Sequence, residues 1–359
     1  MTKTLLTLFS AILLFSCNKQ SEDRGYTLTG SVKNVPDNTM VMMTRNNIDI
    51  DSAMVLNGKF SFSGKVEEPI SVFIVIPEMR EFTSVWLENT DISLTTESGR
   101  FEDRVITGSD IQKEDDLLQA KIKPVQQSRD SARANVRNLS GIERNSVNIF
   151  LDDLQKKEFR VIKEFMRENS NSVAGTFFID LNKKIWGKEK TQELYALLSE
   201  ERRESTDGKM ISHYLKINKD PKVWDQYADF EMNNAAGEAI RLSEIKGKYT
   251  LLYFWAAGCS FCKQENPILV HNYERFKDHG FEILGVSTDN VRSTFLSSIQ
   301  EHDLTWNNLM SPAGTNNDAV LIYGITATPR NYLIDENGTI IARNLRGDAL
   351  TARLEELML

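Results

Sequence analysis

The stretch Thr250–Leu269, TLLYFWAAGCSFCKQENPIL, decides how the fold of this sequence is interpreted. Its first part, Leu251 to Trp255, is an apolar and aromatic run that predicts a fully buried strand. The run breaks at Ala257-Gly258, and a Cys-x-x-Cys pair and a charged helical pattern follow. The predicted order is strand, turn, Cys-x-x-Cys and helix, which places the sulfur of Cys259 at a helix N-terminus.

The two cysteines of this pair suggest redox chemistry. A helix N-terminus stabilises a thiolate, the species that attacks disulfides, so Cys259 is the candidate nucleophile. Cys262, one turn further, is the candidate resolving cysteine, and we expect the two to form a redox disulfide. A structural disulfide or half of a zinc site are the alternatives. Zinc needs two further ligands, and no ligand spacing is found among the histidines, which are His213, His271, His279 and His302.

Composition limits the classes of protein that need to be considered. The chain has 359 residues, a formal net charge of −8 and three cysteines. This length accommodates two or three domains, and the absence of a basic patch argues against a nucleic-acid partner. Outside the Cys-x-x-Cys pair the remaining cysteine is Cys17. We therefore expect cores that fold without a structural disulfide, no metal and no cofactor.

Residues 1–17 predict a lipoprotein signal peptide. Leu5 to Phe15 is almost wholly apolar and too short to span a bilayer of ~30 Å. The tetrapeptide LFSC resembles the bacterial lipobox and predicts lipidation of Cys17. The alternative is an ordinary secretory leader in which that cysteine is incidental. Residues 18–24 are a polar tether, and Asn18 suggests the outer rather than the inner membrane. Both alternatives predict export to the periplasm.

The middle of the chain predicts two further regions. Residues 25–107 predict an all-β domain, either a small sandwich or an open barrel. Within it, Asn57-Gly58 between two short strands is a strong hairpin signal. Residues 108–221 are helical and charged, and Pro124 is expected to interrupt the first long helix. We interpret this region as a helical connector, which either positions the last domain or offers a partner surface.

Residues 222–359 alternate strands with helices and end in a hairpin and a helix. This pattern predicts an α/β domain with a mixed sheet flanked by helices. The region from about residue 224 resembles the TlpA/ResA-like thiol-disulfide oxidoreductases of the thioredoxin superfamily. The motifs that carry the resemblance are Lys246-Gly-Lys, Phe254-Trp255, Cys259-x-x-Cys262, Glu265, Pro267, Ile283–Ser287 and Thr328-Pro329. The N-terminal strands resemble the β domain that precedes thioredoxin-like domains in Bacteroidetes lipoproteins.

The resemblance implies a thioredoxin-like fold and the activity of a protein-disulfide oxidoreductase. It implies that Glu265, three residues after Cys262, is a buried acid that raises the pKa of the resolving thiol or relays its proton. A solvated helix charge is the alternative. It further implies that Pro329 is cis and that the Thr328 backbone pairs with an extended substrate. Trp255 completes the implied substrate-binding set.

The sequence departs from the family pattern at the rim that faces the substrate. Gly258 stands where the family usually has Trp, and Ser260-Phe261 replaces the common Gly-Pro or Glu-Pro. Arg330 follows the cis-proline candidate, where Thr is common. All three departures alter the rim that faces the substrate, so the family's substrates are not carried over to this chain.

The predicted function is the reduction of disulfides in exported proteins by a dithiol mechanism. The partners would be exported proteins with disulfides or thiols and a membrane-bound electron donor, with a lipid anchor to the membrane. A peroxiredoxin-like peroxidase is one alternative. That family places Thr three and Pro seven residues before its reactive cysteine, where this chain has Ala256 and Leu252. A non-enzymatic, redox-sensing lipoprotein that binds a partner is the other.

Overall fold

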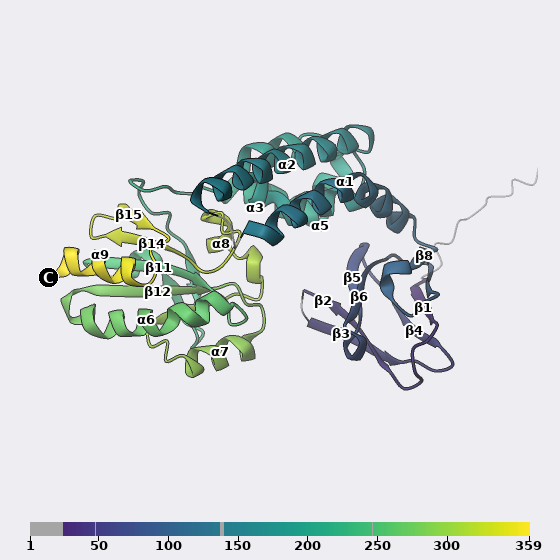
Figure 1. Cartoon of the computed structure of the whole chain (residues 1–359), viewed down its shortest axis with the longest axis horizontal. Helices are drawn as coiled ribbons and strands as arrows, with labels where there is room; N and C mark the ends of the chain where they lie inside the picture. The colour runs from purple at the N-terminus through teal and green to yellow at the C-terminus, as the bar shows by residue number, and fades with distance from the viewer. Residues whose placement is uncertain (1–23, 47, 137–139, 246) are drawn as a thin grey trace, which may run out of the picture. The chain divides into compact units, whose positions relative to one another are not determined.

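The computed structural model describes residues 24–46, 48–136, 140–245 and 247–359. The chain separates into two compact units, one that ends at Lys113 and one that comprises Glu114–Leu359. An all-β region, a helical region and an α/β region follow one another along the chain, which confirms the predicted fold class (Figure 1). The predicted signal peptide and Cys17 lie outside the described residues.

The first unit is a small β sandwich. Its described strands form two four-stranded sheets, in the orders β4-β1-β7-β8 and β3-β2-β5-β6. Alternate side chains from both sheets, such as Leu28 and Ile74, meet in one apolar core, as two packed sheets require. The strands are β1 (Tyr26–Val32), β2 (Met40–Arg45), β3 (Ile48–Met54), β4 (Lys59–Gly64), β5 (Ile70–Ile76), β6 (Glu81–Leu87), β7 (Asp91–Thr96) and β8 (Val105–Thr107).

The Asn57-Gly58 turn forms, but the strands beside it do not form a simple hairpin. Both residues have positive φ, 51° and 69°, as a tight two-residue turn requires. Leu56 and Lys59 close the turn with reciprocal backbone hydrogen bonds of 2.8 and 3.0 Å. The strand before the turn then pairs with β2, and the strand after it pairs with β1. The local signal therefore identifies the turn correctly, whereas the choice of sheet depends on packing.

The helical region contains α1 (Asp110–Asn135), α2 (Gly141–Glu168), α3 (Val173–Tyr195), α4 (Glu200–Glu204) and α5 (Thr206–Ile217). The prediction that Pro124 interrupts the first helix is wrong, because α1 continues through it. Leu118 and Ile122 on this helix are fully buried, and such packing outweighs the ~3 kcal/mol that an internal proline costs. Within α3, Gly187 is non-helical, with φ 78°.

The α/β region has a mixed five-stranded sheet among its described strands, in the order β13-β12-β11-β14-β15. The central strand β11 (Tyr249–Trp255) is parallel to β12 (Phe281–Ser287) and antiparallel to β14 (Arg330–Asp335). Alternate β11 residues enter separate apolar cores, which explains why its sequence is apolar throughout. The remaining elements are β9 (Glu231–Asn233), β10 (Ala239–Arg241), β13 (Asn307–Leu309), β15 (Ile340–Arg343), α6 (Ser260–Phe276), α7 (Arg292–Glu301), α8 (Asp318–Ile322) and α9 (Asp348–Met358).

The helical region packs directly onto the α/β region. Leu321 of α8 is fully buried in the core that α1, α2, α3 and α5 build. Asn218, at the end of α5, donates a 2.7 Å hydrogen bond to the backbone oxygen of Leu321. Lys183 and Lys184 of α3 donate to Asn316 Oδ1 and to the backbone oxygen of Thr315, at 3.1 and 2.6 Å. The two regions thus form one unit.

Candidate active site

The central strand delivers the cysteine pair to the start of a helix. After β11 ends at Trp255, a short turn leads to Cys259, which is the N-cap of α6. The Cys259 sulfur accepts a 3.1 Å hydrogen bond from the backbone N–H of Cys262. The two residues form a disulfide, with their Cα atoms 5.2 Å apart. A helix N-terminus of this kind favours negative charge on the first sulfur.

The two sulfurs differ in their access to solvent. Cys262 is fully buried, whereas Cys259 is half-buried. The residues next to the first cysteine, Gly258 and Ser260, are exposed, and Phe261 is 58% exposed. A client disulfide can therefore approach Cys259 but not Cys262. One sulfur of the pair is therefore accessible at the rim, and the other is shielded.

A carboxylate from the neighbouring strand fixes the turn that precedes the cysteines. Asp289, just beyond β12, accepts a 2.9 Å hydrogen bond from the backbone N–H of Ala257 through Oδ2. The same oxygen accepts a 2.6 Å hydrogen bond from the hydroxyl of Ser287. Sequence reasoning missed this residue. The position of Asp289 just after β12 could have identified it, because the carboxyl ends of adjacent parallel strands meet at one edge of a sheet.

Glu265 is buried, 7% exposed, so it is not a solvated helix charge. Its Oε1 accepts a 2.9 Å hydrogen bond from the backbone N–H of Gly347, the N-cap of α9. The carboxylate lies near Tyr253: burial raises the pKa of that phenol, and the charge of Glu265 raises it further. Glu265 therefore lies within two helical turns of both cysteines. It is buried inside the domain, at the positively polarised N-terminus of α9.

The Thr328–Pro329 peptide bond is cis, which confirms that prediction. Pro329 is buried and Thr328 half-buried. The guanidinium of Arg346 donates a 2.5 Å hydrogen bond to the backbone oxygen of Pro329. Two residues further on, the buried side chain of Asn331 forms hydrogen bonds with both backbone groups of Leu345. The segment 344–347 therefore holds the proline loop and also contacts the helix that carries the cysteines.

The prediction that Trp255 binds substrate is wrong for this structure. Its side chain is fully buried and stacks on Phe295, with ring centroids 5.8 Å apart. Because β11 is covered on both faces, the last aromatic residue of the strand points into a core rather than toward the rim. The apolar residue available at the rim is Phe261 instead.

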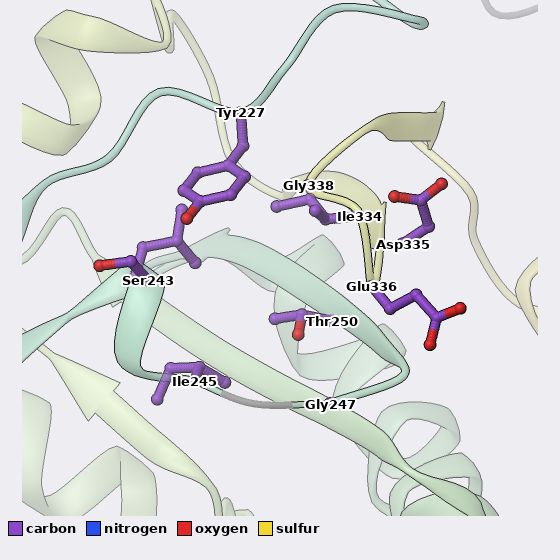
Figure 2. Close-up of a pocket in the computed structure, with 10 residues that line it drawn as sticks. Tyr227, Ser243, Ile245, Gly247, Thr250, Ile334, Asp335, Glu336 and Gly338 are labelled. Carbon is purple, nitrogen blue, oxygen red and sulfur yellow. The ribbon is translucent and has the colours of Figure 1, made fainter.

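A pocket in the α/β region lies at the opposite end of β11 from the cysteines (Figure 2). Its volume is about 200 Å³, and Ser243, Thr250 and Glu336 are among the lining residues. Thr250 is the second residue of β11, and Cys259 follows the other end of this strand. At ~3.3 Å per residue, Thr250 and Trp255 lie ~17 Å apart. This pocket is therefore separate from the redox site. Figure 2 shows Asp335 and Glu336 on the side away from Ser243.

Two further findings apply only to the residues that the structure describes. Among these residues, no group of three or more His, Cys, Asp or Glu side chains could hold a metal ion. None of the helices described has the length and apolar content that spanning a membrane requires.

Comparison with known proteins extends this picture. Residues 223–343 match the AhpC/TSA family, and residues 26–114 match a domain of unknown function, DUF4369. The thiol-disulfide oxidoreductase ResA of Oceanobacillus iheyensis is 33% identical over 135 residues, which cover 36% of this chain and 69% of that protein. The chain belongs to the ResA-like thiol-disulfide oxidoreductases. Bacillus cereus ResA is 25% identical over 145 residues, 40% of this chain and 82% of that protein.

This ResA-like protein is also similar to solved structures. The thioredoxin domain of a thiol-disulfide oxidoreductase from Bacteroides vulgatus is 34% identical, with a TM-score of 0.37; the match covers 39% of this chain and 99% of that one. Membership of the ResA-like family makes this domain an enzyme domain of the thiol-disulfide oxidoreductase class, and the family suggests thiols or disulfides as substrates. The β unit before it matches a domain of unknown function.

Proposed function

We propose that this protein reduces disulfides in exported proteins by a dithiol mechanism, with Cys259 as the nucleophile and Cys262 as the resolving cysteine. The observation that supports this best is the difference in exposure between the two sulfurs of one disulfide. A half-buried sulfur at a helix N-cap is open to a client, while the sulfur that completes the reaction is shielded from it.

The reaction balances in two exchanges. The Cys259 thiolate attacks one sulfur of the client disulfide, a mixed disulfide forms, and the other client sulfur leaves as a thiolate that takes up a proton. The Cys262 thiolate then attacks the Cys259 sulfur, and the second client thiol leaves. The product is the Cys259–Cys262 disulfide seen in the structure. Two electrons and two protons must then come from a donor, which we propose is a membrane-bound protein dithiol.

Glu265 is placed to handle the proton of the buried cysteine. Cys262 must lose its proton before it can attack, and it is fully buried. The carboxylate lies one helical turn further along α6 and is itself buried. A side chain at this spacing faces the same side of the helix. We propose that it takes the proton from Cys262 during resolution.

The location of the enzyme is a proposal that rests on the leader. The apolar segment and the LFSC tetrapeptide support export and lipidation at Cys17, and Asn18 supports the outer membrane. Mass spectrometry of the mature N-terminus tests this: a diacylglycerol adduct on Cys17 is expected. An unmodified mature chain that begins at another residue would contradict lipidation.

Reduction of insulin by excess dithiothreitol tests the activity. The wild-type protein should accelerate insulin precipitation at least tenfold, and Cys259→Ser should abolish the acceleration. Equal rates for the two proteins would contradict the proposal. Consumption of hydrogen peroxide without insulin reduction would favour the peroxidase alternative, although Ala256 and Leu252 replace the Thr and Pro of that family.

A further inference from the structure

A second pocket, of about 410 Å³, lies where helices α3 and α5 meet the loop after α8. Trp186 and Gly187 of α3, Tyr214 of α5 and Gly324 beyond α8 contribute to its walls. These elements belong to one compact unit, and Figure 1 shows α3, α5 and α8 together. The pocket contains none of the redox residues, so it is a separate feature of the molecule.

The walls of this pocket are strongly basic. Among its described lining residues, five are lysines and two are acids, although the chain as a whole has a net charge of −8. Asp220, one of the acids, pairs with Lys222. The four other lysines form no ion pair within the described residues. The basic set consists of Lys184, Lys188, Lys190, Lys219 and Lys222.

The hydrogen bonds of two of these lysines go to neutral backbone oxygens. The ammonium groups of Lys184 and Lys188 donate to the backbone oxygens of Thr315 and Asn218, at 2.6 and 3.2 Å. A carbonyl oxygen satisfies one donor but leaves the net charge in place. Burial, with the nearby Lys183, lowers the pKa of Lys184 to about 8. The charge of Asp180 opposes this shift but does not cancel it, so the charged form of Lys184 carries a burial cost that a bound anion would offset.

Trp186 and Gly187 form part of one wall of the pocket. Trp186 is 5% exposed, and its indole Nε1 is enclosed and is not exposed to the pocket. Gly187 beside it has φ 78°, and a Cβ there would meet no atom within 4 Å. The wall next to the indole is consequently open.

We propose that this pocket binds a phosphate-bearing anion. Lysines act as separate point charges that suit a tetrahedral, multiply charged phosphate. Arginine, whose planar fork matches a carboxylate, is absent from the described lining residues. The volume exceeds that of one phosphate group, so the ligand is a soluble phosphate ester or a phospholipid headgroup.

Calorimetric titration with pyrophosphate, and co-sedimentation with vesicles of phosphatidylglycerol or of phosphatidylcholine, test the proposal. The protein is the full chain carrying Cys17→Ser, so that an acyl group does not cause vesicle binding. The pocket variant is Lys188→Glu/Lys219→Glu. Its matched control is Lys209→Glu/Lys216→Glu, with the same charge change on exposed α5 residues that do not line the pocket.

Saturable binding of pyrophosphate should weaken at least tenfold in the pocket variant and less than twofold in the control. Binding to phosphatidylglycerol vesicles alone, weakened in the pocket variant and not in the control, would support the proposal and identify the ligand as a phospholipid headgroup. Absence of binding in both arms, or equal losses in the pocket variant and its control, would overturn it. Insulin reduction should stay within twofold of wild type in every variant, which separates this test from that of the proposed function.

Discussion

The backbone N–H of Gly347 donates a 2.9 Å hydrogen bond to the Oε1 atom of Glu265. This contact joins the helix that begins at the cysteines to the N-terminus of α9. The preceding residue, Arg346, holds the backbone oxygen of Pro329. Two consecutive residues thus connect the buried acid and the cis-proline loop, so the geometry of the site depends on a segment more than 80 residues from the cysteines.

Two substitutions of Glu265 separate its charge from its structural role. Glu265→Gln keeps an acceptor for the Gly347 N–H, whereas Glu265→Ala leaves that donor without one. We expect the alanine variant to lower the free energy of unfolding by about 1–3 kcal/mol and the glutamine variant by less than about 1 kcal/mol. Both should lengthen the lifetime of the mixed disulfide, measured by acid quenching. A glutamine variant that resolves as fast as wild type would exclude the proton-transfer role.

Asp289 positions the turn that carries the cysteine pair, so we expect it to affect both stability and rate. Asp289→Ala removes the acceptor of the Ala257 N–H, which should cost about 1–3 kcal/mol of unfolding free energy. Insulin reduction should slow about tenfold because the turn loses its fixed geometry. Asp289→Asn keeps an acceptor oxygen and should stay within threefold of wild type. Equal losses of insulin-reducing activity in the two variants would show that the activity depends on the charge of Asp289 rather than on its positioning of the turn.

Two glycines of the α/β region should respond in opposite ways to a side chain. A Cβ at the exposed Gly258 would meet no atom within 4 Å, whereas at Gly285 it would lie 2.2 Å from Asn308 Oδ1. Gly258→Trp should therefore change the free energy of unfolding by less than about 0.5 kcal/mol. Gly285→Ala should lower it by about 1–3 kcal/mol. Urea unfolding measures both, and a strongly destabilised Gly258→Trp would contradict the open rim.

Gly258→Trp should also alter client recognition. A tryptophan beside Cys259 adds apolar contact surface of the kind that the family usually has there, and ~1 kcal/mol of extra contact corresponds to about a fivefold change in affinity. The apparent KM for a disulfide-containing peptide should fall by about that factor while kcat changes little. An unchanged KM would indicate that clients do not contact this side of the rim.

Lys184 makes stability depend on pH in a predictable direction. Burial lowers its pKa from 10.5 to about 8 in the folded protein. Between these values the unfolded chain binds more protons, so the free energy of unfolding should rise with pH. Relative to Lys184→Met, the wild type should gain about 1–2 kcal/mol from about pH 7.5 to about pH 10. A pKa shift of one unit corresponds to ~1.4 kcal/mol of free energy. The expected gain is smaller than the full shift would give, because the side chain is partly exposed. If the stability difference between wild type and Lys184→Met fell as the pH rose, the lowered pKa of Lys184 would be contradicted.

The redox domain could be predicted from sequence because its signals are local. The apolar run of β11, the break at Ala257-Gly258 and the Cys-x-x-Cys pair specify strand, turn and helix directly. The cis state of Pro329 followed from the family resemblance and is confirmed. These features depend on backbone chemistry within a few residues, and the structure preserves them.

Features that depend on distant contacts could not be predicted in this way. Pro124 is a helix breaker by its own chemistry, yet α1 continues through it because neighbouring residues are buried. Trp255 was expected to bind substrate, but coverage of both faces of β11 encloses its side chain. Asp289 and Gly347 contact the site only through the order of the strands and the position of α9. Sequence periodicity contains no information about such partners.

The measurement that tests the central claim most directly is trapping of mixed disulfides in cells that produce Cys262→Ser, with Cys259→Ser as the matched control. The account predicts several exported proteins bound to Cys262→Ser, all released by reductant, and none bound to the control. A single trapped partner would favour a redox-sensing role instead. Trapping by Cys259→Ser, or by neither variant, would contradict the assignment of Cys259 as the attacking sulfur.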